Sequence, residues 1–371
     1  MKIATITCHD VYNYGASLQA YALQKYCTSQ GCLYTIIDYK PDYLSRHFNL
    51  WGIANPVYDR PLLRQLYLLA KLPQRIIALK KKKRFDEFTR RFLSLSDLRY
   101  QSCTELENNC PDADLYIAGS DQIWNTFFPN GHDRAFYLDF VKRKANKISY
   151  AASFATDKIY NDADSFVAKQ IQNFDAVSVR ETSALYLLRK LGRNDGTVVA
   201  DPVFLLDHDQ WTSILPPSKP RRRKYILLYD CEKSPLMREM ALHLKKITGL
   251  PVYSVAGTYG RYADSDFSLS GPLEFLKLIS EAEYVLANSF HALAFSLIFR
   301  KKFFIANRSE NINTRMVDFL SCLKLSDRLI SEPDFISTDE VDFVSVSEIL
   351  SGLVERSRTF LNQHIHEPSQ E

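Results

Sequence analysis

The sequence predicts an α/β protein built from two doubly wound parallel-sheet domains. Short apolar runs of strand type alternate with helical patterns through most of the 371 residues. The alternation stops near residue 215 and resumes near residue 225, beyond a basic, proline-rich segment. Repeated strand-helix units of this kind are typical of parallel sheets with right-handed crossovers.

Composition excludes several classes of protein. A hydrophobic content of 46% fits a large core, and a net charge of +4 gives no reason to expect nucleic acid as a partner. The seven cysteines contain no C-x-x-C pair, so neither a disulfide framework nor a structural zinc site is expected. No apolar run approaches the roughly 18 residues that a membrane span requires, and we expect a cytoplasmic protein.

The first domain is expected over residues 1–215. Its opening strand, 2–8, leads into a polar loop before a helical pattern. Ligands of open α/β sheets bind outside the carboxyl ends of strands, so the loop supplies candidate acceptor-binding residues. They are His9, Asp10, Asn13 and Tyr14. The loop has no G-x-G-x-x-G or Walker A pattern.

Residues 41–100, which follow a second strand at 34–39, are expected to form a helical insertion. Within it, 75–85 is strongly basic, with Phe85, Phe88 and Phe92 at helical spacing. Two interpretations stay open. The helix is either solvated and packed through its rings, or it contacts anionic lipid or a polyanionic substrate.

A third strand near 114–118 ends in small and acidic residues. Gly119 and Ser120 permit close approach of a ligand, and Asp121 is a candidate base for a sugar hydroxyl. Trp124 is a candidate platform for stacking a sugar ring. The alternative is an Asx-type turn followed by a core tryptophan.

Further strands are expected at 148–155 and 176–181, and the segment 198–206, which contains the turn-type dipeptide Asp201-Pro202, closes the first domain. Arg180 stands at the end of one of them. Its planar fork is suited to a carboxylate or phosphate, unless it is used in a structural pair with an acidic neighbour.

The segment 216–224 is predicted to be a linker, followed by a second domain over 225–345 and by a C-terminal helix and polar tail over 346–371. In the second domain a buried strand, 284–287, breaks at Ser289 and resumes as a helix. His291 therefore lies at a helix N-terminus, where backbone N–H groups favour an anion. Arg315 is a further candidate on the same side of the expected cleft.

Several of these segments together resemble the polysaccharide pyruvyl transferase family. They are residues 13–20 (NYGASLQA), 119–125 (GSDQIWN), 178–181 (SVRE), 201–202 (DP) and 289–291 (SFH). The resemblance implies a GT-B-like pair of Rossmann-like domains. It also implies transfer of a pyruvyl group from phosphoenolpyruvate to two hydroxyls of a sugar, giving a ketal.

By position, the resemblance places Arg180 and His291 among residues that hold or protonate the donor. Some relatives carry Arg two residues before this histidine, where this chain has Ser289. Donor binding is then expected to rest on Arg180, Ser289, His291 and Arg315, with His291 as the acid and Asp121 as the base. No metal and no further cofactor are expected.

The expected partners are phosphoenolpyruvate and a glycan acceptor, such as a lipid-linked precursor of an exopolysaccharide or capsular polysaccharide. Such an acceptor would bring the enzyme to the inner face of the cytoplasmic membrane as a peripheral protein. A GT-B-type glycosyltransferase with a nucleotide-sugar donor is the alternative, since fold alone does not fix function. A glycan-binding protein without turnover is a third interpretation.

Overall fold

The first half of the chain forms a parallel sheet. In this computed structural model, residues 1–45, 61–142, 144–217, 221, 223–256, 262–308, 313–333, 336 and 339–366 are described. Seven strands pair in the order β3-β2-β1-β4-β5-β6-β7. They are β1 (Lys2–Ile6), β2 (Leu33–Tyr39), β3 (Leu95–Tyr100), β4 (Leu115–Ala118), β5 (Asn146–Ala152), β6 (Ala176–Val179) and β7 (Thr197–Val198).

The second half forms a parallel sheet of six strands in the order β10-β9-β8-β11-β12-β13. They are β8 (Ile226–Tyr229), β9 (Val252–Ser254), β10 (Ser265–Asp266), β11 (Tyr284–Ala287), β12 (Lys302–Ala306) and β13 (Leu329–Ile330). In each sheet the order reverses once, between β1 and β4 and between β8 and β11. These are the switch points where α/β sheets bind ligands. The prediction of two doubly wound parallel sheets is confirmed.

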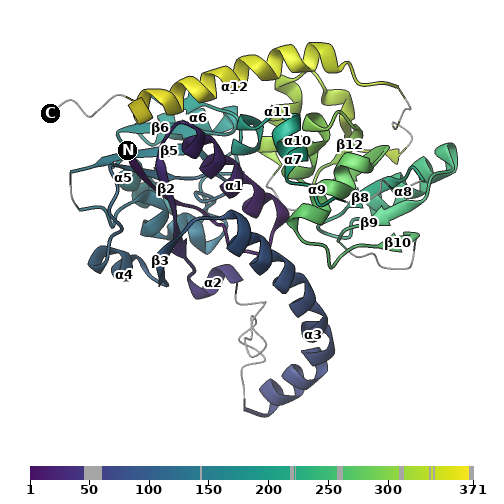
Figure 1. Cartoon of the computed structure of the whole chain (residues 1–371), viewed down its shortest axis with the longest axis horizontal. Coiled ribbons are helices and arrows are strands. Elements are labelled where there is room, and N and C mark those ends of the chain that lie inside the picture. Colours follow the sequence, from purple (N-terminus) through teal and green to yellow (C-terminus); the bar gives the residue numbers. More distant parts are fainter. Residues whose placement is uncertain are drawn as a thin grey trace.

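Helices lie around both sheets (Figure 1). In the first half they are α1 (Tyr14–Ser29), α2 (Asp42–Ser45), α3 (Pro61–Phe92), α4 (Cys103–Asn108), α5 (Asp164–Ile171), α6 (Thr182–Lys190) and α7 (His208–Ser213). In the second half they are α8 (Pro235–Thr248), α9 (Pro272–Glu281), α10 (Phe290–Ile298), α11 (Thr314–Cys322) and α12 (Phe343–His366). Short 3-10 helices occur at Pro129–His132, Arg134–Tyr137, Pro202–Leu205 and Ser326–Arg328.

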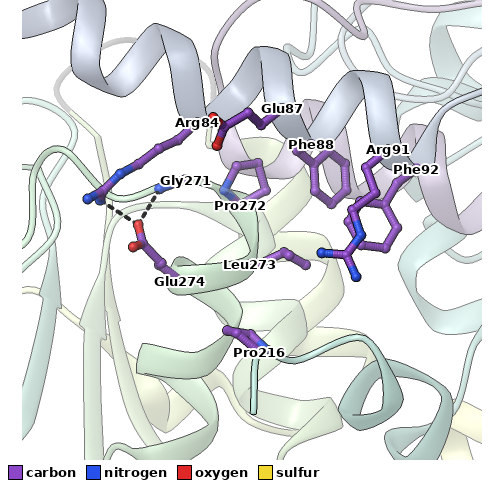
Figure 2. A pocket seen from close by; sticks show the side chains of 10 residues that line it. All are labelled: Arg84, Glu87, Phe88, Arg91, Phe92, Pro216, Gly271, Pro272, Leu273 and Glu274. Atoms are coloured by element: carbon purple, nitrogen blue, oxygen red, sulfur yellow. Dashed lines mark hydrogen bonds and ion pairs between the residues drawn. The ribbon is translucent and has the colours of Figure 1, made fainter. Parts of the chain in front are cut away.

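The long helix α3 bridges the two halves with its C-terminal part. Arg84 pairs with Glu274 of α9 at 2.6 Å and donates to the carbonyl of Leu269 at 3.0 Å. Figure 2 shows this pair beside Gly271. A Cβ added to Gly271 would lie only 2.9 Å from the Cβ of Arg84, so the glycine allows the close approach of α3. The N-terminal part of α3 projects away from both sheets (Figure 1).

Much of the basic run in α3 is used in packing. Lys81 lies over the rings of Tyr14 and Phe85 at 4.8 and 5.8 Å, and burial lowers its pKa. Lys82 pairs with Asp86 at 2.6 Å. The prediction that rings pack this helix holds at Phe85 and Phe88, which are both buried.

The helix α12 runs back over the first half. Ser357 accepts from the backbone N–H of Ala200 at 2.7 Å, and Arg358 donates to the carbonyl of Leu205 at 3.2 Å. Asn362 accepts from the hydroxyl of Tyr26 at 3.0 Å. The helix α12 is therefore bonded to the first half through α1 and through the segment around the 3-10 helix Pro202–Leu205.

One predicted element is wrong in detail, and one predicted turn is found. Residues 95–100, expected inside a helical insertion, form the edge strand β3, whose three exposed positions in a row, 97–99, do not give the alternation of buried and exposed side chains that marks a strand. At the predicted turn-type dipeptide Asp201-Pro202 the chain enters the 3-10 helix Pro202–Leu205, which Asp201 caps by accepting from the N–H of Val203. Three predictions lie in part outside the described residues: the insertion over 46–60, the linker at 218–220 and 222, and the polar tail at 367–371.

Candidate functional site

Arg180 is the centre of a buried charged cluster. It follows β6, and its side chain is 2% exposed. The guanidinium pairs with Asp201, lies 3.3 Å from Asp121 and rests over the ring of Phe290 at 4.7 Å. Burial opposes its charge, but Asp201 and Asp121 outweigh burial and raise the pKa of Arg180. The guanidinium of Arg180 therefore stays charged although it is almost inaccessible to solvent.

Asp121 joins two arginines that come from different halves of the chain. Its Oδ1 lies 3.3 Å from Nη2 of Arg180 and 3.6 Å from Nη1 of Arg315. Burial would raise the pKa of Asp121, but Arg180, His291 and Arg315 outweigh it and lower this pKa. The carboxylate is therefore ionised at neutral pH, and its low basicity makes it a weak proton acceptor.

Asp201 links Arg180 to His291. Its Oδ2 pairs with Arg180 and lies 3.6 Å from Nε2 of His291, while Oδ1 accepts from the N–H of Val203 at 3.1 Å. Burial would raise the pKa of Asp201, but His291 and Arg180 outweigh burial and hold it well below the usual range. Asp201 is therefore an ionised carboxylate in contact with the guanidinium of Arg180 and close to the imidazole of His291.

His291 lies at the start of α10, as predicted, and is packed against α1. Its side chain is 7% exposed. A Cβ added to Gly15 would lie 2.5 Å from Cε1 of His291 and still closer to Nδ1. Asn13 caps the same end of α1 by accepting from the N–H groups of Gly15 and Ala16 at 2.9 and 3.3 Å. The N-terminal ends of α1 and α10 therefore meet at this imidazole.

Arg315 reaches the cluster from the first turn of α11. The amide oxygen of Gln122, turned toward it, accepts from Nη1 at 2.7 Å and from Nη2 at 2.8 Å. Its guanidinium carbon lies 6.0 Å from the centre of the Phe290 ring. Burial, with Arg180 nearby, lowers the pKa of Arg315 to about 10, so the group stays charged at neutral pH.

Glu181 holds the loop beside the cluster. Its Oε1 accepts from the hydroxyl of Ser153 and from the N–H groups of Phe154 and Ala155, at 2.8 to 2.9 Å. Burial raises the pKa of Glu181 although Arg180 opposes this change. We therefore assign it a positioning role.

The loop after β1 is fixed to the loop after β4. The hydroxyl of Thr7 donates to the carbonyl of Ser120 at 3.0 Å and accepts from Gln19 at 2.9 Å. Gln19 also accepts from the N–H of Ser120 at 3.3 Å. The carboxyl ends of these neighbouring strands therefore form one continuous edge next to Asp121.

The structure brings four predicted residues together: Asp121, Arg180, His291 and Arg315. Ser289 is half-buried directly before α10, and its side chain makes no capping hydrogen bond. His9 is buried, with Nε2 3.3 Å from Asp38.

Asp10 and Asn13 are also predicted to bind the acceptor, and both make contacts within the protein. Asp10 pairs with Lys40, and Asn13 is the N-cap of α1.

Tyr14 and Trp124 are not placed to bind an acceptor. Tyr14 is 1% exposed, stacks on Phe275 at 4.4 Å and joins the two halves. Trp124 is fully buried, stacks on Tyr137 at 5.7 Å and donates to the carbonyl of Phe136 at 3.2 Å. Both predictions of a sugar contact are corrected, because neither ring has a free face.

Three residues of the cluster escaped prediction as site residues. Asp201 belongs to a dipeptide that is typical of turns, and Gln122 is one amide beside a more conspicuous aspartate. Gly15 lies within the segment 13–20, which carries the family resemblance but does not indicate its contact with His291. Gly15 and His291 are 276 positions apart, and the sequence contains no signal for their contact.

Two general properties of the described residues bear on the site. None of the described helices is long and apolar enough to cross a bilayer. Within the same residues, no three His, Cys, Asp or Glu side chains are grouped to hold a metal ion. A reaction without a metal stays a prediction.

Solved structures share the fold at low sequence identity. A protein described as a UDP-N-acetylglucosamine 2-epimerase from Listeria monocytogenes matches with a TM-score of 0.53 and 10% identity, covering 100% of this chain and 98% of that chain. Arabidopsis thaliana UGT89C1 with UDP-L-rhamnose matches with a TM-score of 0.48 and 8% identity, covering 98% of each chain. At such identity the first likeness shows the fold alone, a GT-B-like pair of α/β domains.

Sequence comparison identifies the family. No curated protein sequence matches the chain. The sequence profile of the polysaccharide pyruvyl transferases matches residues 13–310, which include Gly15, Asp121, Arg180, Asp201 and His291. The chain therefore belongs to the polysaccharide pyruvyl transferase family and is a transferase.

Proposed function

We propose that this transferase moves a pyruvyl group from phosphoenolpyruvate to two hydroxyls of a glycan, forming a ketal. The observation that carries the proposal is the pair of buried guanidinium groups, Arg180 and Arg315, which share Asp121 and lie against Phe290. Phosphoenolpyruvate carries a carboxylate and a phosphate, and an arginine fork binds either group strongly.

The donor's negative groups would compete with Asp121 and Asp201 for the two arginines. The N–H groups at the start of α10 add a partial positive charge. The half-buried Ser289 offers a hydroxyl at the same helix end. It supplies a hydrogen bond where some relatives supply a charge, so in this chain the donor's charge is met by Arg180 and Arg315.

His291 is the proposed acid. It gives a proton to the methylene carbon of phosphoenolpyruvate, which produces a methyl group and an oxocarbenium-like centre. The neighbouring carboxylate of Asp201, 3.6 Å away, stabilises the imidazolium before this transfer. Asp201 therefore acts through His291 and is a positioning residue.

The first sugar hydroxyl attacks the cationic centre and forms a carbon–oxygen bond. The phosphate then leaves, and the second hydroxyl closes the ketal. Of the two hydroxyl protons, one restores His291 and the other leaves with phosphate. Asp121 was predicted as the base. With its lowered pKa, we propose instead that it accepts a hydrogen bond from the attacking hydroxyl and orients it.

A lipid-linked acceptor is the proposed substrate, and the projecting part of α3 supports a contact with the membrane. Leu66, Leu69, Ile76 and Ile77 are each more than half exposed there. The same stretch contains basic residues, a combination that suits anionic lipid surfaces.

The experiment is a comparison of donors. The purified protein is incubated with a galactose-terminated lipid-linked glycan and either phosphoenolpyruvate or a nucleotide sugar. Phosphate release together with a pyruvyl mass increment supports the proposal, and His291→Ala should abolish both. Nucleotide release with transfer of a sugar would show the alternative, a glycosyltransferase.

A further inference from the structure

A charged pocket lies under α3, outside the cluster around Arg180. Its volume is about 440 Å³. It is lined by four cationic residues, two carboxylates, one hydroxyl and one apolar side chain. They are Lys40, Lys82, Arg90 and Arg99, then Asp10 and Asp86, then Thr89 and Leu95.

The pocket keeps an excess of positive charge after its ion pairs are counted. Lys40 pairs with Asp10, and Lys82 pairs with Asp86 at 2.6 Å. Arg99 pairs at 2.8 Å with Asp38, which is buried behind the pocket wall. Among the residues that the structure describes here, four cations therefore face three carboxylates, and one positive charge is left to meet a ligand.

The pocket opens at the same edge of the first sheet as the candidate active site. Lys40 directly follows β2, Arg99 lies on β3, and Asp10 follows β1. The loop after β1 is in turn bonded to Ser120 through Thr7, one residue before Asp121. The pocket and Asp121 therefore lie at the same edge of the first sheet.

The pocket geometry is held by an aromatic ring. Lys40 and Lys82 approach the ring of Tyr12 at 5.1 and 5.4 Å. Tyr12 is 5% exposed and packs edge-on against Phe85 of α3 at 6.0 Å. The two ammonium groups are therefore fixed relative to the sheet edge.

We infer that this pocket binds an anionic group, a phosphate or a carboxylate, of the glycan acceptor. The inference rests on the proposed function in taking a glycan as the ligand. The anion is held by Arg90, Lys82 and Arg99, with the hydroxyl of Thr89 as a further donor. The acceptor's neutral sugar then extends along the edge toward Asp121. A phosphate in this pocket would also lie next to the helix whose other end carries the exposed leucines.

Binding is tested without any donor, so the result does not depend on phosphoenolpyruvate. Glucose 1-phosphate, glucuronic acid and glucose are titrated into the full chain by calorimetry. Lys82→Gln is compared with Lys83→Gln, because the two lysines are adjacent and each forms an i,i+4 pair, with Asp86 and Glu87. Lys83 is 79% exposed and does not line the pocket.

At least one of the two charged sugars should bind more tightly than glucose. Lys82→Gln should weaken the binding of that sugar by about tenfold, because one hydrogen bond to a charged group is lost. Lys83→Gln should leave it unchanged. Tighter binding of glucose 1-phosphate assigns a phosphate, and tighter binding of glucuronic acid assigns a carboxylate. Equal binding of glucose, equal effects of the two substitutions, or no binding at all would overturn the inference. Ketal formation on a phosphate-bearing acceptor with the same KM in Lys82→Gln as in wild type would overturn it while leaving the proposed function in place.

Discussion

Gly15 and His291 are in direct contact, although they belong to helices of different halves. The imidazole occupies the space that any side chain at position 15 would need, since an added Cβ would lie 2.5 Å from Cε1. The backbone of Gly15 does not adopt the left-handed conformation that only glycine favours. The glycine is therefore required by the space that His291 fills.

Gly15→Ala should leave the protein folded and reduce kcat by about 100-fold, because displacing a reacting group by about an ångström has an effect of this size. Alanine is the better helix former, so any loss of stability comes from the displaced imidazole and not from the helix itself. Steady-state kinetics with phosphoenolpyruvate and acceptor measure the change. Gly352→Ala in α12 is the control, since its Cβ would meet only Nη1 of Arg356 at 3.9 Å. Equal kcat values for Gly15→Ala and wild type would show that catalysis does not depend on the position in which Gly15 allows the His291 ring to lie.

Asp201 and Glu181 should respond to pH in opposite directions. The folded-state pKa of Asp201 is lowered, so its contribution to stability is present above the ordinary pKa of about 4 and is lost as pH falls. Asp201→Asn should therefore cost about 3 kcal/mol at pH 7, and the difference from wild type should shrink toward pH 3.

The folded-state pKa of Glu181 is raised, so its contribution to stability is present at low pH and is lost as pH rises through that pKa. Glu181→Gln keeps an oxygen acceptor for Ser153, Phe154 and Ala155, and it should be at least as stable as wild type at pH 7. Urea unfolding from pH 3 to 7 measures both variants. A loss of similar size in both at pH 7 would contradict the assigned charge states.

The projecting part of α3 should bind anionic vesicles. Replacing both Leu66 and Leu69 with Gln should weaken sedimentation with phosphatidylglycerol vesicles, because these exposed side chains are available for burial in the lipid interface. Charge reversal at the exposed residues Lys80 and Lys83 should weaken sedimentation further, and added salt should reduce this difference because it screens exposed charges. Tyr186→Gln, at an exposed aromatic on α6, is the control. Unchanged sedimentation of the Leu66, Leu69 variant would contradict a membrane role for α3.

The sequence predicts site residues well where a reactive side chain directly follows a buried strand. Arg180, Asp121 and His291 each come just after a buried apolar strand, and parallel strands bring such positions to one edge. Trp124 also follows a strand, but nothing local shows that its ring turns into a pocket made by Tyr137, Phe154 and Phe174. Burial of that kind is decided by segments distant in sequence.

Edge strands and contacts between the two halves of the chain are also difficult to predict from local sequence. The strand β3 is an edge strand with three exposed residues, so it lacks the apolar alternation that identifies a strand. The fit of Gly15 to His291 depends on how α1 and α10 meet, and so does the role of Asp201. These features follow from packing of the two halves and have no local signature.

In the proposed reaction His291 protonates the methylene carbon of phosphoenolpyruvate, and two hydroxyls then capture the resulting centre. Turnover in D₂O tests it directly, by mass spectrometry and NMR of the glycan product. We predict one phosphate released per ketal and one deuterium in each new methyl group, with both signals lost in His291→Ala. A ketal methyl group without deuterium, or phosphoenolpyruvate left unchanged beside a suitable acceptor, would contradict the claim.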